Sequence, residues 1–462
     1  MPDFSYILPA FKAYDIRGQV PDQLNRETAF RIGAAFVKAI EAKKVVIGHD
    51  IRLSSPELTE ALTEGMVSLG AEVTQIGLCG TEEIYYACGI GDFDGGVMVT
   101  ASHNPSQYNG IKMVLRGAKP LFQETGLSKI RELVAGDWNP QDDLTAERGQ
   151  VKEWNLHEEF ADYVLRSIDL EAIAKANFKI LANCGNGGVK VVLDKLKDKL
   201  PAKMVLINEE PDGHFPNGIP NPLLPENRQS TSEGVLKYET DLGVAWDGDF
   251  DRCFFFDEKG QFIEGYYLVG LFASRFMLKD SSSTIIYDPR LYWNTREIAQ
   301  QFGGKAVMSR TGHAFIKQAM RDNNAVYGGE MSAHQYFKDF FYCDSGILPL
   351  LMLLELMAKT GQKLSQLVGD RMVRYPVSGE INSQISKPVE EILQNVKNAL
   401  QEKYGPSLQE SRVDGLGLDY ANFRLNLRAS NTEPLIRLNV ETKSDKELLE
   451  EVTQMVLEVI RA

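Results

Sequence analysis

Helical and extended patterns alternate along most of this chain, and the alternation occurs three times. In the first stretch, apolar residues at helical spacing over 24–42 are followed by apolar, β-branched runs at 45–47, 72–76 and 96–99. Short strands separated by helices of this length are typical of βαβ units with a largely parallel sheet. The pattern therefore predicts that the chain folds as successive α/β units.

The alternation recurs in two further stretches. In the second, strands at 178–182 and 205–208 flank a glycine-rich turn and a helix. The third stretch is predicted to hold three strands and two helices: strands 284–287, 306–308 and 326–327, and helices near 293–302 and 313–322. Each stretch has the size of one α/β domain.

The pattern changes after about residue 371. Helices near 389–403 and 445–461 enclose strands around 421–427 and 435–441, which is typical of a smaller α+β domain. The 462 residues suggest about three domains by length, but the patterns favour four. The patterns therefore predict three α/β domains of similar size plus a C-terminal α+β domain. The predicted boundaries are 1–149, 150–260, 261–371 and 372–462.

Charge and cysteine content restrict the partners. Lys and Arg number 50 against 64 Asp and Glu, so the net charge is −14. A surface of this sign repels nucleic acid and anionic membranes, and we expect neither as a partner. The five cysteines form no CxxC pair, and the longest apolar stretch, 347–354, is far shorter than the roughly 20 residues of a membrane span. No secretory signal is apparent at the N-terminus, so we expect a cytoplasmic protein.

The first candidate site is a loop that directly follows the strand at 96–99. Its sequence is Thr-Ala-Ser-His-Asn-Pro over residues 100–105. Ligands collect at the carboxyl ends of strands in α/β sheets, so Ser102 lies where a reacting group could sit. A serine-rich turn that caps the next segment is the alternative, and His103 taken alone is more often a hydrogen-bonded loop residue than a catalyst.

The second candidate is acidic. Asp247, Asp249 and Asp251 alternate with other residues, and in an extended backbone this spacing points all three carboxylates to one side. Three close anions need a divalent cation such as Mg²⁺ or Ca²⁺. An EF-hand is excluded because its sixth position requires glycine and is Arg252 here, with a strand-like flank. A solvated acidic turn stays open as an alternative.

Two further loops carry polar side chains after predicted strands. Glu330 and Ser332 could together bind neighbouring hydroxyl groups of a polyol, although a plain strand-to-helix turn is equally compatible. Arg428 opens a loop rich in hydroxyl and amide groups, which could bind a dianion through charge-assisted hydrogen bonds. A hydroxyl-rich hairpin turn is the alternative for that loop.

The four loops, in their order along the chain, resemble those of the α-D-phosphohexomutase superfamily, and more closely those of the bacterial phosphomannomutases. The resemblance runs from the segment at 11–18 to the Arg428 loop, nearly the whole chain. It implies three related α/β domains with mixed sheets plus a C-terminal α+β domain, arranged around a central active-site cleft. It also implies an isomerase that interconverts mannose 6-phosphate and mannose 1-phosphate for GDP-mannose synthesis. The reaction would pass through a phosphoserine enzyme and a hexose 1,6-bisphosphate intermediate, with Mg²⁺ as cofactor and a hexose phosphate as substrate.

The resemblance also implies residue roles. Ser102 would carry the phosphoryl group and, through it, bind the metal together with Asp247, Asp249 and Asp251. The other catalytic residues would include Lys112 and Arg252, with Lys112 near the reacting serine. For proton transfer we expect His103 and His334 as candidates, because a histidine is the better-matched acid or base at pH 7. The substrate-binding residues would be Tyr14, Arg17, His313, Glu330, Ser332, Arg428, Ser430, Asn431 and Thr432, and we expect Arg290 to add a contact to a phosphate or a hydroxyl.

Two positions depart from many relatives. A Pro-Thr-Pro turn is replaced by Gly80-Thr81-Glu82, and Arg290 stands where several relatives have lysine. Both variants resemble the phosphomannomutase branch. A phosphoglucomutase or a dual-specificity phosphomannomutase/phosphoglucomutase is the alternative of the same class, and a metal-dependent sugar phosphatase or a sugar-phosphate binding protein belongs to another class. We expect a monomer or a weak homodimer.

Overall fold

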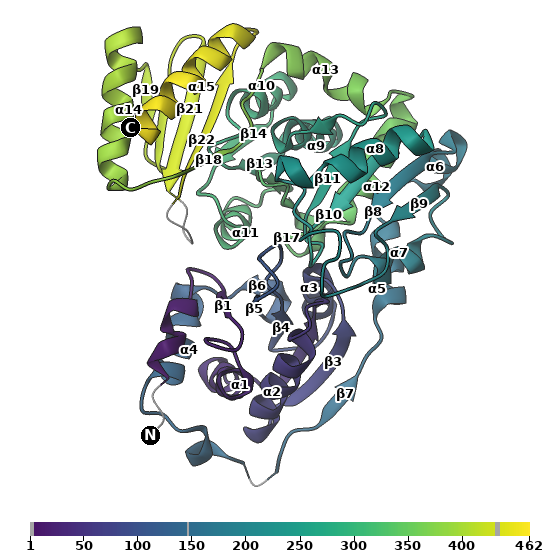
Figure 1. Ribbon diagram of the computed structural model, residues 1–462. Helices are drawn as coiled ribbons and strands as arrows, with labels where there is room; N and C mark the ends of the chain where they lie inside the picture. Colours follow the sequence, from purple (N-terminus) through teal and green to yellow (C-terminus); the bar gives the residue numbers. More distant parts are fainter. Residues whose placement is uncertain (1–3, 146, 430–434) are drawn as a thin grey trace. The chain divides into compact units, whose positions relative to one another are not determined.

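The computed structural model describes residues 4–145, 147–429 and 435–462, and it divides into two compact units. Unit 1 consists of Met1–Phe262 and His334–Lys363, and unit 2 consists of Ile263–Ala333 and Leu364–Ala462. Both units combine sheets with helices (Figure 1). This division does not test the four domain boundaries, which stay predictions.

The first sheet of unit 1 is mixed. Its strands lie in the order β1-β5-β4-β2-β3-β7, with β6 paired to β5. Strand β2 is parallel to β3 and β4, whereas β5 is antiparallel to β1 and β4. The strands are β1 (Ile16–Gln19), β2 (Lys44–His49), β3 (Glu72–Leu78), β4 (Gly95–Val99), β5 (Tyr108–Leu115), β6 (Lys119–Pro120) and β7 (Val151–Glu153). The accompanying helices are α1 (Arg26–Ile40), α2 (Ser55–Ser68), α3 (Thr81–Ile90) and α4 (Leu127–Ala135).

Local sequence explains how α1 begins and packs. Asn25 Oδ1 accepts from Thr28 N at 3.0 Å, and Asn25 N donates to Thr28 Oγ1 at 2.9 Å, which is a capping box. The buried face of α1, including Phe36, joins Val45 and Ile47 of β2 in one apolar core. This core anchors the strands from whose ends the loop with Ser102 emerges.

Four strands of the second sheet lie in the order β11-β10-β8-β9. Strand β8 is parallel to both β9 and β10, whereas β11 is antiparallel to β10. Its strands are β8 (Lys179–Asn183), β9 (Lys203–Ile207), β10 (Leu242–Trp246) and β11 (Cys253–Phe256), and the short β12 (Phe262–Ile263) marks the unit boundary. Its helices are α5 (His157–Leu165), α6 (Leu170–Ala176), α7 (Lys190–Leu196) and α8 (Gln229–Tyr238). Unit 1 also contains the antiparallel pair β16 (Gln335–Phe337) and β17 (Cys343–Asp344), followed by α12 (Leu348–Thr360).

Unit 2 begins with three parallel strands in the order β14-β13-β15. These are β13 (Thr284–Tyr287), β14 (Lys305–Met308) and β15 (Tyr327–Gly329). The helices of this part are α9 (Gly265–Lys279), α10 (Trp293–Phe302), α11 (His313–Asp322) and α13 (Leu364–Arg374).

The C-terminal part of unit 2 is an antiparallel sheet in the order β18-β22-β21-β20-β19. Its strands are β18 (Ile381–Gln384), β19 (Gln409–Ser411), β20 (Leu416–Asp419), β21 (Phe423–Ala429) and β22 (Leu435–Thr442). Helices α14 (Val389–Tyr404) and α15 (Lys446–Arg461) pack their apolar residues against one face, which carries Leu425 and Leu427. Side chains alternate along a strand, so Arg424 and Arg428 belong to the opposite, polar face.

The predicted fold class is confirmed in its main features: mixed sheets with helices, and a C-terminal antiparallel sheet domain. Among the helices of the described residues, none is long and apolar enough to cross a membrane.

Candidate active site

Ser102 lies in the loop between β4 and β5. Its backbone adopts φ of +51°, in the left-handed region, and its side chain is buried. The hydroxyl donates to Asp247 Oδ2 at 2.8 Å and lies 3.1 Å from His103 Nδ1. The structure thus brings the predicted hydroxyl of Ser102 into direct contact with the predicted acidic loop.

The acidic loop joins β10 to β11. Carboxylate oxygens of Asp247, Asp249 and Asp251 lie within 4.8 Å of one another, and all three side chains are buried. Asp249 Oδ1 and Asp251 Oδ1 accept no hydrogen bond from any described residue. Buried carboxylate oxygens without a hydrogen-bond partner are costly, and oxygen ligands of this kind suit a hard divalent cation. The donor set therefore fits a metal site.

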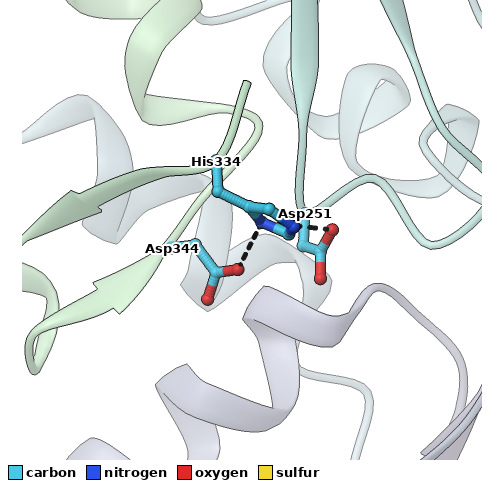
Figure 2. Close-up of side chains that lie close together, drawn as sticks. All are labelled: Asp251, His334 and Asp344. Atoms are coloured by element: carbon cyan, nitrogen blue, oxygen red, sulfur yellow. Dashed lines mark ion pairs between the residues drawn. The ribbon is translucent and has the colours of Figure 1, made fainter. Parts of the chain in front are cut away.

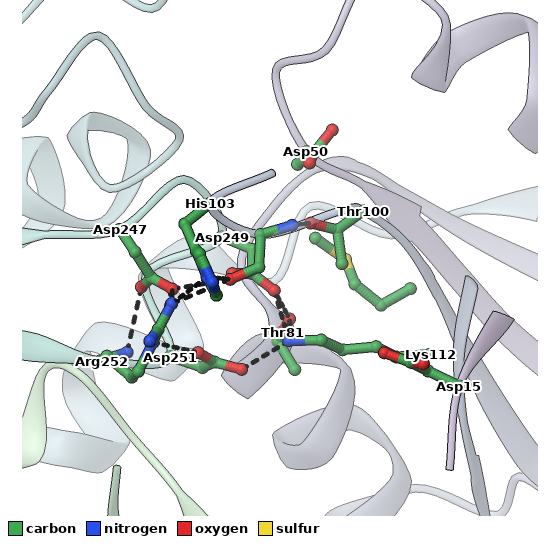
Figure 3. Close-up of polar contacts among 12 residues, drawn as sticks. Asp15, Asp50, Thr81, Thr100, His103, Lys112, Asp247, Asp249, Asp251 and Arg252 are labelled. Atoms are coloured by element: carbon green, nitrogen blue, oxygen red, sulfur yellow. Dashed lines mark hydrogen bonds and ion pairs between the residues drawn. The ribbon is translucent and has the colours of Figure 1, made fainter. Parts of the chain in front are cut away.

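Two basic side chains pair with these carboxylates (Figure 3). Lys112 Nζ donates to Asp249 Oδ2 and to Asp251 Oδ2, each at 2.6 Å. Arg252 donates from Nη2 to Asp247 Oδ2 at 2.6 Å and to the hydroxyl of Ser102 at 3.2 Å. Both cations are largely buried, and they offset two of the three negative charges of the acidic loop.

This pairing shifts the pKa values of the site. Burial would lower the pKa of Lys112, but Asp249 and Asp251 raise it overall. Burial opposes ionisation of Asp249, yet Lys112 holds the pKa of that carboxyl well below its usual range. Burial and the charge of Asp249 raise the pKa of Asp251 to about 6. Lys112 is therefore a positive charge in this site and a poor proton acceptor.

The pKa values of the two candidate histidines shift in opposite directions. His103 contacts Arg252, and burial with the charges of Arg252 and Arg17 lowers its pKa well below the ordinary value. His334 lies with its Nδ1 2.8 Å from Asp344 Oδ2 and 3.9 Å from Asp251 Oδ1 (Figure 2). Burial would lower the pKa of His334, but the two carboxylates raise it.

Arg17 of β1 connects the start of the chain to the Ser102 loop. Its guanidinium donates to Asn104 Oδ1 at 2.7 Å and to Asp15 Oδ2 at 2.8 Å. Tyr14, in the same segment, is half-buried. The structure thus places Arg17 in contact with the Ser102 loop and Tyr14 in the segment that makes this contact.

Two polar partners in unit 1 were missed by the sequence analysis. Thr81, at the start of α3, donates from Oγ1 to Asp249 Oδ2 at 2.5 Å. The available signal was the unusual turn at residues 80–82, which departs from many relatives. Asp344, the partner of His334, gave no local signal because ten residues separate the two in sequence.

In unit 2, a buried carboxylate gathers three arginines. Glu380 Oε2 accepts from Arg290 Nη1 at 2.7 Å and from Arg428 Nη2 at 3.3 Å, and its Oε1 accepts from Arg437 Nη1 at 3.4 Å. Arg290 also pairs with Asp288 at 2.7 Å. Glu380 thus connects the predicted residues Arg290 and Arg428, and the sequence alone gave no indication of it.

The other predicted residues of unit 2 lie near the same strand ends. Glu330 Oε1 accepts from Gly312 N at 2.7 Å, directly before His313 at the start of α11. Asp288 accepts from the backbone N–H of Met331 at 2.8 Å, which connects the Arg290 loop to the Glu330 loop. Ser332 is half-buried. Ser430, Asn431 and Thr432 lie outside the described residues.

The contribution of Glu380 to the free energy of unfolding should depend on pH. Burial opposes its ionisation, but Arg290, Arg428 and Arg437 lower its pKa to about 2, from an ordinary value of 4.5. Since the folded pKa lies below the unfolded one, this contribution, on the order of 3 kcal/mol, is complete above about pH 4.5 and disappears toward pH 2. We expect E380Q to unfold at lower urea than wild type at pH 7, with a difference that shrinks toward pH 3. Exposed E402Q is the control, and a pH-independent difference for E380Q would contradict this account.

Nearly the whole chain matches known proteins. Four segments match phosphoglucomutase/phosphomannomutase domains: alpha/beta/alpha domain I at residues 9–139, domain II at 158–260, domain III at 264–375 and the C-terminal domain at 380–459. These segments follow one another in the order of the domain numbers.

Individual relatives have similar coverage. Phosphohexose mutases of Xanthomonas campestris pv. campestris are 49% identical over 98% of this chain and 99% of the relative. A phosphomannomutase of Escherichia coli is 46% identical, with the same two coverages of 98% and 99%. The crystal structure of a phosphoglucomutase/phosphomannomutase family protein from Burkholderia thailandensis matches with a TM-score of 0.86 and 28% identity, over 98% of this chain and 97% of that chain.

Proposed function

Because the chain belongs to the phosphoglucomutase/phosphomannomutase family and is a mutase of phosphohexoses, an isomerase, we propose that it interconverts mannose 6-phosphate and mannose 1-phosphate. Relatives named phosphomannomutase, at 45–47% identity over nearly the full length, support the choice of sugar. The contact of Ser102 Oγ with Asp247 supports a phosphoserine mechanism most directly, because it joins a nucleophilic hydroxyl to the candidate metal loop.

In the proposed reaction, Ser102 carries a phosphoryl group. The free hydroxyl oxygen of the sugar phosphate forms a bond to this phosphorus, the bond to Ser102 Oγ breaks, and Ser102 Oγ takes up the proton that the hydroxyl releases. The resulting hexose 1,6-bisphosphate turns over. Transfer of its other phosphoryl group back to Ser102 then releases the isomeric monophosphate. We propose His103 and His334 as the candidates for moving the proton.

Charge neutralisation is the main catalytic requirement of such a transfer. Asp247, Asp249 and Asp251 would hold Mg²⁺ together with an oxygen of the phosphoserine, and the ion would supply positive charge beside the transferring group. Arg252 already contacts both Asp247 and the hydroxyl of Ser102, so it would stabilise charge on the transferring oxygens. Lys112 would hold the acidic loop in place and add a second positive charge.

The other predicted residues would bind the remainder of the substrate. Glu330 would accept hydrogen bonds from sugar hydroxyls, and Ser332 would donate to them or accept from them. Tyr14, Arg17 and His313 would be further binding residues. Arg428, together with Ser430, Asn431 and Thr432, would bind the phosphate that does not react. Arg290 would contact a phosphate or a hydroxyl. Three further properties stay predictions: that the product supplies GDP-mannose synthesis, that the protein is cytoplasmic, and that it is a monomer or a weak homodimer.

Sugar preference is the test of the proposed substrate. Mannose and glucose differ here only in the orientation of the hydroxyl at C2. We expect kcat/KM for mannose 1-phosphate to exceed that for glucose 1-phosphate by about tenfold or more, because a site that hydrogen-bonds a hydroxyl rejects the wrong geometry. Both assays contain the same trace of hexose 1,6-bisphosphate. Equal values would instead favour a dual-specificity enzyme, an alternative supported by the relatives named phosphohexose mutases.

A further inference from the structure

Arg52 is a buried arginine that contacts the Ser102 loop. It lies just after β2 and is 1% exposed. Its guanidinium donates to four main-chain carbonyl oxygens of the Ser102 loop and the first residue of β5: Ser102 O at 2.9 Å, Asn104 O at 2.6 Å, Pro105 O at 2.8 Å and Tyr108 O at 2.9 Å. One planar guanidinium therefore hydrogen-bonds several carbonyl groups of the segment that contains Ser102.

The Ser102 carbonyl is also confined on a second side. A Cβ atom added to Gly248 of the acidic loop would lie 2.5 Å from Ser102 O, so the two backbones are in close contact. Within the loop, Ser102 N donates to Thr100 Oγ1 at 2.8 Å. The left-handed backbone of Ser102 is therefore held at its N–H, at its carbonyl oxygen and at its side chain.

Arg52 is itself held from two directions. Asp50 Oδ2 lies 3.3 Å from Arg52 Nε, and Asp50 Oδ1 accepts from Arg52 N at 3.0 Å and from Ser55 Oγ at 2.6 Å. The ring of Phe215 lies 5.6 Å from the guanidinium carbon, within the range of a cation–π contact. Phe215 belongs to the proline-rich segment at 211–225, whose Gly213 packs against Ile51 O. The segment thus covers the buried arginine.

We propose that Arg52 is a positioning residue, which fixes the Ser102 loop so that its hydroxyl faces the acidic loop, and that Phe215 keeps its guanidinium in place. This inference rests on the proposed function, in which Ser102 carries the phosphoryl group. A lysine at this position has a single ammonium centre and cannot serve four carbonyl oxygens in one plane. The loop of an R52K protein would therefore sample positions in which Ser102 cannot react.

The chain provides a matched control for this substitution. Arg31 of α1 is also buried, and it donates to four main-chain carbonyl oxygens: those of Val134, Leu133, Gly136 and Trp138. These carbonyls belong to the end of α4 and the turn after it, and not to the Ser102 loop. R31K thus loses comparable hydrogen bonds and comparable stability without changing the position of Ser102.

The test measures kcat, KM and the rate at which Ser102 of the full-length protein takes a phosphoryl group from glucose 1,6-bisphosphate, followed by mass spectrometry. We expect R52K to lower kcat and the phosphorylation rate on the order of 10²-fold, as a misplaced reacting group does, with KM for the sugar phosphate unchanged. Hydrogen exchange at 100–108 should become faster. R31K should keep the wild-type kcat and phosphorylation rate.

The possible outcomes separate this inference from the proposed function. An R52K protein with wild-type kcat, or an R31K protein that loses as much, overturns the inference while the phosphoserine mechanism stands. A wild-type protein that never takes phosphate on Ser102 overturns the proposed function and this inference together. If R52K does not fold, F215L removes only the aromatic face over the guanidinium. It should lower kcat in the same direction, and a wild-type kcat for F215L would contradict the role of Phe215 and of the arginine it holds.

Discussion

Replacing Ser102 by alanine should abolish mutase turnover. The hydroxyl is the group that would accept and return the phosphoryl group, and its loss leaves no covalent carrier beside Asp247. We expect kcat to fall on the order of 10⁴-fold or more, as the loss of a covalent nucleophile does. The measurement is conversion of mannose 1-phosphate with hexose 1,6-bisphosphate present.

Ser106 provides the matched control. It is exposed in the same loop, four residues further along the chain, and S106A should keep full turnover. An S102A protein that retains activity would contradict the phosphoserine mechanism. If that activity releases inorganic phosphate, the protein is a metal-dependent phosphatase, in which the acidic loop activates water.

Asp249→Asn should have the second largest effect. Its Oδ2 accepts from Lys112 at 2.6 Å and from Thr81 at 2.5 Å, while its Oδ1 is a candidate metal ligand. The amide removes one negative charge from the metal site and leaves buried Lys112 with one carboxylate partner. We expect a loss of 10² to 10³-fold in kcat, roughly that of deleting one electrostatic contact to a transition state. The Mg²⁺ concentration for half-maximal activity should rise.

The control for this change is Asp257→Asn. Asp257 is also buried and lies close in sequence, but its Oδ1 accepts from Lys259 N and Gln261 N in a turn, a role that asparagine can keep. D257N should behave as wild type in both kcat and Mg²⁺ dependence. Unchanged kcat and Mg²⁺ dependence in D249N would show that the acidic loop does not hold the catalytic metal.

Much of the fold follows from local sequence pattern. The strand predicted at 284–287 coincides with β13, and the helices predicted near 293–302 and 313–322 coincide with α10 and α11. Helix α3 was missed because residues 81–88 are all buried, so it lacks the alternation of apolar and polar faces that marks a surface helix. In the structure, Gly80 N donates to Glu83 Oε2 at 2.9 Å, so a side chain inside the helix completes its first turn.

The candidate site was predictable where neighbouring residues act together. The acidic loop was found from its spacing, but the physical reason given for it was wrong: the loop is not extended, since Phe250 has φ of +44°. A turn, and not the alternation of a strand, gathers the three carboxylates. Arg52, Thr81 and Glu380 were missed because each acts through residues far away in sequence. No local pattern specifies which distant carbonyl or carboxylate a buried side chain will reach.

The most direct test of the phosphoserine mechanism follows the phosphoryl group itself. The purified protein is incubated with hexose 1,6-bisphosphate, freed of it, and mixed with mannose 6-phosphate, while mass spectrometry follows the peptide that contains Ser102. The account predicts one phosphoryl group on Ser102, which disappears as hexose 1,6-bisphosphate forms, and none in S102A. Full mutase activity from a protein whose Ser102 never carries phosphate would contradict it.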